Sequence, residues 1–403
     1  MIPGGACAMK ESGMSGASRT TRAMTRTSAI LFVAFCLCAT ASGQASQFER
    51  FEQLARRAEQ VLDANPAEAV RLYREALKIR PAWVDGWLYM GAALYQLERY
   101  AEATHALRKG LELAPRIGTA WALLGLCEAE LDNVEQGLAD IAKGEQLGLG
   151  ANLDFEVAVR VKAARLLLAR GSFDEAMGKM YPLSKKKIDH PAIEEIMGLS
   201  ALAVYRDSGS LTPEQREMVR IAGKAAWAGG TGRPAEALAG YDELVRKFPK
   251  APGVHYARAL YLMESDPKAA LEEFRQEVEN APDHWPALLM LANLEIRQGQ
   301  PDEALKHLER ALELVPVSYR WICHASIGQA HLTAGRLEPA IAKLEKATRL
   351  VSGNAQIHYY LSQAYRRAGR KEDAARELAE FQRLKEIEDP LALPAFQPGA
   401  RRQ

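Results

Sequence analysis

Apolar residues recur every three or four positions through most of the chain, and the stretch Trp285–Pro316 shows this pattern most clearly. Leu288 and Leu291 lie on one face of its first half, which predicts a short amphipathic helix. Gly299 and Pro301 interrupt the pattern, because glycine suits the end of a helix and proline suits the first turn of the next. A second apolar stripe follows, so the stretch predicts two helices joined by a tight turn.

Each predicted helix has about a dozen residues, which is too short to be stable alone in water. The apolar stripes must therefore be buried against other parts of the chain. Similar stretches supply that surface, because a small residue recurs in the second helix at near-constant intervals. These small residues are Ala69, Ala103, Gly137, Ala176, Ala237, Ala270, Ala304, Ala340 and Ala374. Most intervals are close to one another in length, and the interval before Ala237 is much longer than the rest.

A helix–turn–helix period of about 34 residues resembles that of the tetratricopeptide repeat family. In the second copy the matching residues are Trp87, Gly91, Leu94, Ala103, Leu107 and Pro115. The resemblance covers about 50–388. It implies an all-α fold, a right-handed superhelical solenoid of about nine antiparallel helix pairs, in which the first helices line a concave groove.

The register of the repeats breaks between Ala176 and Ala237. This interval is shorter than two full repeats of about 34 residues each. It predicts two helices, over about 191–206 and 212–228, where two repeats would have three. Thr212 suits the N-cap of the second, because its side chain can accept a hydrogen bond from the first turn. We expect an irregular junction with one unpaired helix, which shifts the alternation of helix direction.

The N-terminus differs in kind from the repeats. Three arginines, the last at Arg26, precede an apolar run over 29–41 that small residues follow. Basic, apolar and small segments in this order predict a Sec signal peptide, with Met24 as an alternative start. We expect residues 1–43 to be removed on export, which makes the protein periplasmic or secreted. The alternative is an uncleaved segment that anchors the chain in the inner membrane.

These features predict how the chain is organised. The expected segments are a leader at 1–43, an N-terminal repeat block at 44–187, an irregular junction at 188–212, a C-terminal repeat block at 213–388 and a flexible tail at 389–403. The tail contains several prolines and cannot continue a helix.

Composition narrows the classes of partner. The chain has 52 Lys and Arg against 51 Asp and Glu, whereas a nucleic-acid-binding protein usually has a large basic excess. No stretch beyond the leader has the roughly 20 apolar residues of a membrane span. Cys127 and Cys323, the two cysteines beyond the leader, each lie in a helical Ala- and Leu-rich context that is typical of a small buried side chain.

No arrangement of residues indicates an enzyme. The chain has no nucleophile elbow, phosphate-binding loop or zinc-binding helix motif. The glycine-rich segment Gly229–Pro234 lacks the Lys-Ser/Thr of a phosphate loop and falls at a predicted turn. His324 and His331 lie roughly 10.5 Å apart along a helix, too far to share one metal ion. We expect no catalytic residue, no cofactor and no metal site.

The remaining candidate site is the groove that the resemblance implies. By register, its predicted residues are Leu88, Tyr95, Leu126, Tyr256, Leu260, Leu289, Asn293, Ile296, Gln329, Tyr359, Gln363 and Arg366. A mixed apolar, aromatic and polar surface suits a peptide segment. We therefore predict an exported, non-enzymatic scaffold that binds a partner protein or peptide. The alternative is a structural subunit or accessory factor of a bacterial cell-envelope assembly or polysaccharide export system.

Overall fold

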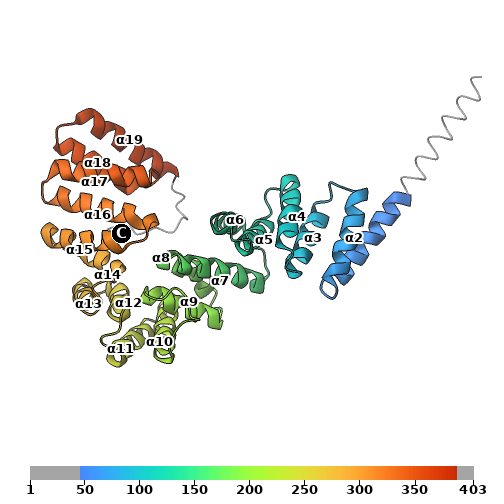
Figure 1. The fold of residues 1–403 in the computed structure, drawn as a ribbon, viewed down its shortest axis with the longest axis horizontal. Helices are drawn as coiled ribbons and strands as arrows, with labels where there is room; N and C mark the ends of the chain where they lie inside the picture. The colour runs from blue at the N-terminus through green and yellow to red at the C-terminus, as the bar shows by residue number, and fades with distance from the viewer. Residues whose placement is uncertain (1–45, 388–403) are drawn as a thin grey trace, which may run out of the picture. The chain divides into compact units, whose positions relative to one another are not determined.

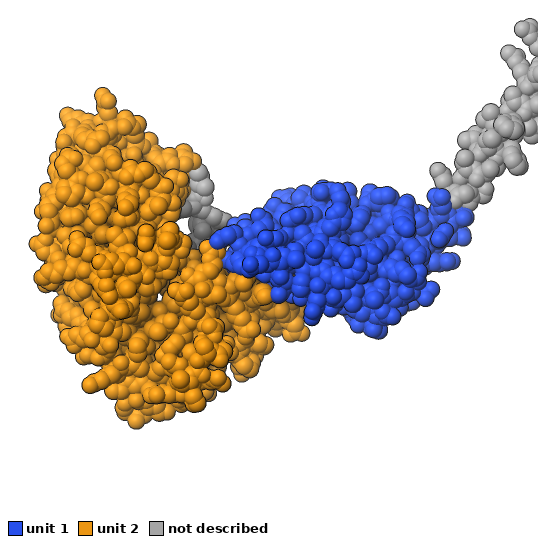
Figure 2. All heavy atoms as spheres, viewed as in Figure 1, with its two compact units in different colours: residues 1–148 blue, residues 149–403 orange. Residues whose placement is uncertain are grey.

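The computed structural model describes residues 46–387, which form helices joined by short loops (Figure 1). Within residues 46–387 there is no strand, and no helix is long and apolar enough to cross a membrane. The chain divides into two compact units, residues 1–148 and residues 149–403, which Figure 2 shows in different colours. The predicted leader at 1–43 and tail at 389–403 lie outside the described residues.

Unit 1 is built from helix pairs. Its described helices are one over 46–61, α2 (Pro66–Ile79), α3 (Val84–Gln96), α4 (Tyr100–Leu113), α5 (Gly118–Glu130) and α6 (Val134–Leu147). Helices that follow one another pack together, and Tyr73, Leu94 and Leu107 belong to one buried apolar core. The stripes seen in the sequence therefore face each other, as the short helices require.

Unit 2 continues the same plan with more helices. They are α7 (Leu153–Ala169), α8 (Phe173–Lys185), α9 (Pro191–Leu202), α10 (Pro213–Gly230), α11 (Pro234–Lys247), α12 (Val254–Leu262), α13 (Pro267–Asn280), α14 (Trp285–Arg297), α15 (Pro301–Leu314), the 3-10 helix η1 (Val317–Tyr319), α16 (Arg320–Thr333), α17 (Leu337–Leu350), α18 (Ala355–Arg367) and α19 (Lys371–Ile387). The hairpin predicted at Trp285–Pro316 is α14 and α15. The predicted all-α solenoid of helix pairs is confirmed.

A residue with left-handed backbone lies in the turn of most helix pairs. Between α14 and α15 it is Gly299, at a φ of 75°. In unit 1 the same place is taken by Glu98 (φ 57°) and Asp132 (φ 63°), for which this conformation is costly. The packing of the two helix faces therefore fixes the turn even where the sequence has no glycine.

The small residues on paired helices mark contacts between backbones. A Cβ atom on Gly125 of α5 would lie 2.5 Å from the carbonyl oxygen of Gly137 on α6. A Cβ on Gly198 of α9 would lie 2.1 Å from the carbonyl oxygen of Val219 on α10. No side chain fits at such crossings, which explains why small residues recur through the repeats.

The junction contains the two helices that were expected. The first ends at Leu202, earlier than predicted, because Ala203 has left-handed backbone (φ 52°). The N-cap at Thr212 is confirmed as part of a capping box, in which Thr212 Oγ1 accepts a hydrogen bond from the backbone N–H of Gln215 at 3.2 Å.

The predicted junction at 188–212 lies inside unit 2, whose boundary with unit 1 follows Gly148. Helix α9 packs against both α8 and α10. The unpaired helix expected at the junction stays a prediction. The division into blocks at 44–187 and 213–388 stays a prediction.

Candidate functional site

Four first helices carry an aromatic ring whose nitrogen bonds to the loop that precedes the helix. We call Trp87, Trp121, His255 and His358 the ring donors. Each bonds to the carbonyl oxygen of the residue six positions earlier, at 2.8, 2.9, 2.9 and 3.0 Å respectively. Those carbonyls end the preceding repeat, so each ring donor ties one repeat to the one before it.

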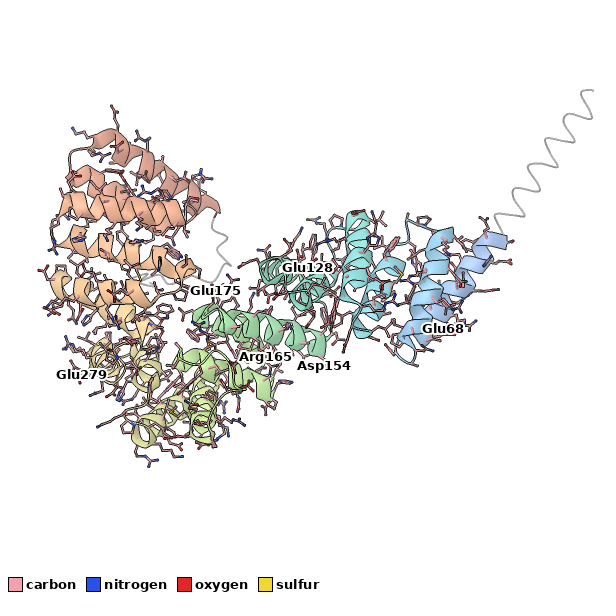
Figure 3. All side chains as sticks on the ribbon, in the orientation of Figure 1. Glu68, Glu128, Asp154, Arg165, Glu175 and Glu279 are labelled. Carbon is pink, nitrogen blue, oxygen red and sulfur yellow. The ribbon has the colours of Figure 1, made fainter. Side chains whose placement is uncertain are left out.

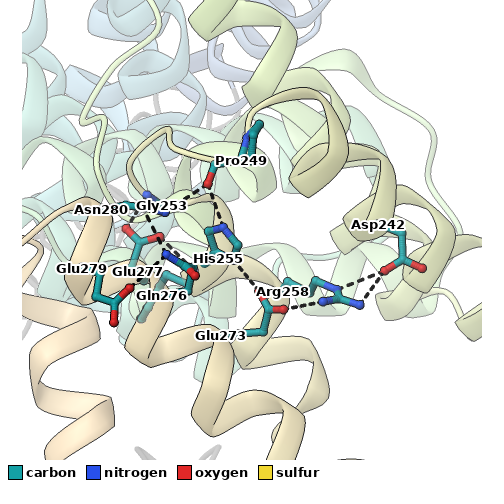
Figure 4. Close-up of polar contacts among 11 residues, drawn as sticks. Asp242, Pro249, Gly253, His255, Arg258, Glu273, Gln276, Glu277, Glu279 and Asn280 are labelled. Carbon is teal, nitrogen blue, oxygen red and sulfur yellow. Dashed lines mark hydrogen bonds and ion pairs between the residues drawn. The ribbon is translucent and has the colours of Figure 1, made fainter.

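The histidine ring donors also bond to a glutamate on the second helix of their pair. His255 Nδ1 lies 2.6 Å from a carboxylate oxygen of Glu273, and Arg258 pairs with the other oxygen of that carboxylate (Figure 4). Burial alone would lower the pKa of His255, but the hydrogen bonds to Glu273 and to the Pro249 carbonyl raise it above its usual value. His358 Nδ1 lies 2.6 Å from Glu377 in the same way.

A second carboxylate on α13, that of Glu277, is buried completely (0% exposed). It accepts hydrogen bonds from the backbone N–H groups of Gly253 at 2.6 Å and Tyr256 at 3.2 Å, and it lies 2.7 Å from Nδ1 of His284. The other ring nitrogen of His284 lies 3.3 Å from the carbonyl oxygen of Ala203. This network joins the end of α9 to α12, α13 and α14.

The predicted groove residues differ in how much of their surface is accessible. Four are buried: Leu126, Tyr256, Leu289 and Ile296. Six are partly exposed: Leu88, Tyr95, Leu260, Asn293, Gln329 and Gln363. Tyr359 and Arg366 on α18 are exposed. A buried side chain cannot touch a partner without rearrangement, so the first four serve the core, and partner contact by the other eight stays a prediction.

Tyr256 is buried because other parts of unit 2 cover it. Its ring packs against Phe274 and His284, with ring centroids 5.9 and 4.8 Å apart. Helix α8 also contacts the segment between α15 and α16, because the hydroxyl of Tyr319 in η1 donates a hydrogen bond to Glu175 of α8 at 3.2 Å. Glu175 is labelled in Figure 3. Among the predicted groove residues of unit 2, those that keep accessible surface are Leu260 on α12 and residues on the three first helices α14, α16 and α18.

A row of side-chain amides runs along these three first helices. Asn293, Gln329 and Gln363, which we call the carboxamide row, each lie the same number of positions before the small residue of the paired helix, which is Ala304, Ala340 or Ala374. Helix α14 contacts α16, and α16 contacts α18, so the row crosses neighbouring helices at equivalent positions. Within the described part of the chain, none of the three amides forms a side-chain hydrogen bond. Their donors and acceptors are available to a ligand.

The two cysteines predicted to be buried are buried and free. Burial raises the pKa of both thiols, Cys127 and Cys323, to about 12, so neither is a reactive thiolate at neutral pH. Among residues 46–387, no group of three or more His, Cys, Asp or Glu side chains is placed to hold a metal ion.

Comparison with protein families identifies the repeats. Three models described as tetratricopeptide repeats match the chain, one over 286–352, one over 222–284 and 326–385, and one over 84–117. The chain is a tetratricopeptide repeat protein. The matched segments cover the repeat of α3 and α4 and most of the helices from α10 onwards, and α9 lies outside them.

Solved structures similar to this tetratricopeptide repeat protein include a fragment of MamA from Desulfovibrio magneticus RS-1. It is 22% identical, with a TM-score of 0.38, over 42% of this chain and 95% of that chain. Another is YrrB, described as a TPR protein with an unusual peptide-binding site, which is 20% identical with a TM-score of 0.37 over 42% of this chain and 87% of that chain. No curated protein matches the sequence.

Reasoning from the sequence missed the polar contacts inside this repeat protein. The signal was present, because histidines recur at the ring-donor position and a glutamate follows the small residue by three positions at Glu273 and Glu377. The period of the repeats places His255 and His358 on first helices, but it does not pair them with residues on the neighbouring helix. The link from Ala203 to His284 spans 81 positions, and no local pattern predicts it.

Proposed function

We propose that this protein is a non-enzymatic scaffold that binds an extended segment of a partner protein along α14, α16 and α18. The observation that supports this proposal is the carboxamide row. A side-chain amide offers both a donor and an acceptor, which match the C=O and N–H of a peptide unit. Such contacts hold a backbone without selecting its side chains.

The spacing of the row suits an extended chain. Neighbouring helices pack about 8–10 Å apart, and an extended chain rises about 3.3 Å per residue, so each amide meets every third peptide unit. Tyr359 and Arg366 lie on the same helix as the last member of the row and are exposed. They offer an aromatic surface and a positive charge to the side chains of the partner segment.

The carboxamide row is tested by removing it. Asn293, Gln329 and Gln363 are replaced together by alanine, and affinity is measured for peptides selected on the wild-type protein from a library of random dodecapeptides. We expect affinity to fall at least about tenfold, because several ligand hydrogen bonds are lost. The control replaces three exposed amides that lie off this row, Gln276, Gln300 and Gln382. Equal affinity in the first variant and the wild type, with helical content unchanged, would move the site to another surface.

We also propose that the scaffold acts outside the cytoplasm, in the periplasm or after secretion. The basic, apolar and small segments of residues 1–43 support export. Mass spectrometry of the protein purified from its native cells should find a mature N-terminus within a few residues of Ser42. A chain that keeps residues 29–41 would contradict cleavage and favour the membrane-anchored alternative.

A further inference from the structure

His324 on α16 occupies the place of a ring donor but lacks the partners of one. It precedes the small residue Ala340 by the same number of positions as His358 precedes Ala374. In the pairs of His255 and His358, a glutamate lies three positions after the small residue. In the pair of His324 that place is taken by Lys343.

The side chain of His324 is 3% exposed, and its Nδ1 has no hydrogen-bond partner among the described residues. In the repeats of His255 and His358, which we call the sibling repeats, Nδ1 of the histidine lies 2.6 Å from a carboxylate oxygen. An unpaired buried polar atom is costly, so a native structure that keeps one calls for an explanation.

The charges around His324 are all positive. Burial, together with the positive charges of Lys346, Lys343 and Arg320, lowers the pKa of His324 to about 4. Lys343 is partly exposed, and Lys346 and Arg320 are exposed. None of these three cations forms an ion pair with a carboxylate in the part of the chain that the structure describes. Three cations without ion pairs therefore lie near the buried Nδ1 of His324. The equivalent Nδ1 atoms of His255 and His358 contact a carboxylate.

We propose that Arg320, His324, Lys343 and Lys346 form a binding site for an aspartate or glutamate side chain of an acidic partner segment. The partner carboxylate takes the place that Glu273 and Glu377 occupy in the sibling repeats. Because Nδ1 of His324 is buried, the partner carboxylate reaches it only when neighbouring side chains rearrange, and the flexible stem of Lys343 allows that side chain to pair with the incoming oxygen. Lysine and arginine bonds to a carboxylate are about twice as strong as neutral hydrogen bonds.

This site is separate from the carboxamide row. His324 precedes Gln329 by five positions on α16, which at about 3.6 residues per turn is about 140° around the helix. The carboxamide row contacts peptide backbone, whereas this site recognises a charged side chain. Loss of one site therefore leaves the other intact, and the two proposals fail independently.

The test measures binding of a fluorescent decapeptide of alternating glutamate and glycine to the full chain, with inorganic phosphate as a competitor. Lys343→Glu installs the glutamate of the sibling repeats, so we expect at least about a tenfold loss of affinity and a higher Tm. The charge-matched control is Lys268→Glu, at an exposed lysine on α13, which should change affinity less than about twofold. A milder variant, Lys346→Ala, should reduce affinity severalfold.

The histidine gives a second readout that does not depend on affinity. In NMR spectra, the imidazole signals of His324 should shift when the peptide is added to the wild type and should not shift in Lys343→Glu. Equal affinities of the wild type and Lys343→Glu, an equal loss in Lys268→Glu, or no response of His324 would each overturn the proposal. Displacement of the peptide by phosphate at equal concentration would overturn the assignment to carboxylates.

Discussion

Replacing Glu277 with alanine is expected to lower the free energy of unfolding of unit 2 by about 3–5 kcal/mol. The change removes a fully buried carboxylate and leaves two backbone N–H groups, those of Gly253 and Tyr256, without acceptors. It also leaves the buried ring of His284 without its carboxylate partner. Each unsatisfied buried group carries its own desolvation cost.

The measurement is urea unfolding followed by circular dichroism, with hydrogen–deuterium exchange to place the loss on α12–α14. Glu279→Ala is the control, because Glu279 lies two positions further along α13 and is exposed. It should change stability by less than about 0.5 kcal/mol. A loss below about 1 kcal/mol in Glu277→Ala would show that the network contributes little to stability.

Replacing Gly198 with alanine is expected to destabilise unit 2 by about 3 kcal/mol or more. The added methyl group would lie 2.1 Å from the carbonyl oxygen of Val219, and backbone cannot rotate away as a side chain can. Helices α9 and α10 must therefore separate, which also disturbs the segment that carries Ala203.

The matched control for this substitution is expected to change the stability of the protein in the opposite direction. Gly178 is also a helical glycine, on α8, and nothing lies within 4 Å of the Cβ that alanine would add. Alanine has the higher helix propensity, so Gly178→Ala should stabilise the protein by about 0.5–1 kcal/mol. Thermal unfolding of both variants checks the pair, and similar effects at the two positions would contradict the proposed backbone contact.

The repeats were predictable because two of their physical requirements repeat in the sequence. The crossing of paired helices needs small residues such as Gly137 and Ala304, and the turn needs a breaker such as Gly299. These requirements are local and appear in most copies. The two helices α9 and α10 were also predictable, since the interval between copies changes there.

The accessibility of the groove was not predictable in the same way. Register gives Tyr256 and Tyr359 equivalent places on α12 and α18, yet the first is buried and the second is exposed. The ring of Tyr256 packs against His284, at the start of the next repeat, and its helix α12 contacts α9. The pattern of a single repeat contains no information on which other repeat will cover it.

The ring donors determine where a shorter version of this protein can begin. The acceptor of each ring nitrogen belongs to the repeat before it, so a fragment cut at the first residue of a helix loses that bond. A fragment starting at Val254 would leave Nε2 of His255 without the carbonyl of Pro249, whereas one starting at or before Pro249 keeps it. The independent structural module is therefore a helix pair together with the last residues of the preceding repeat.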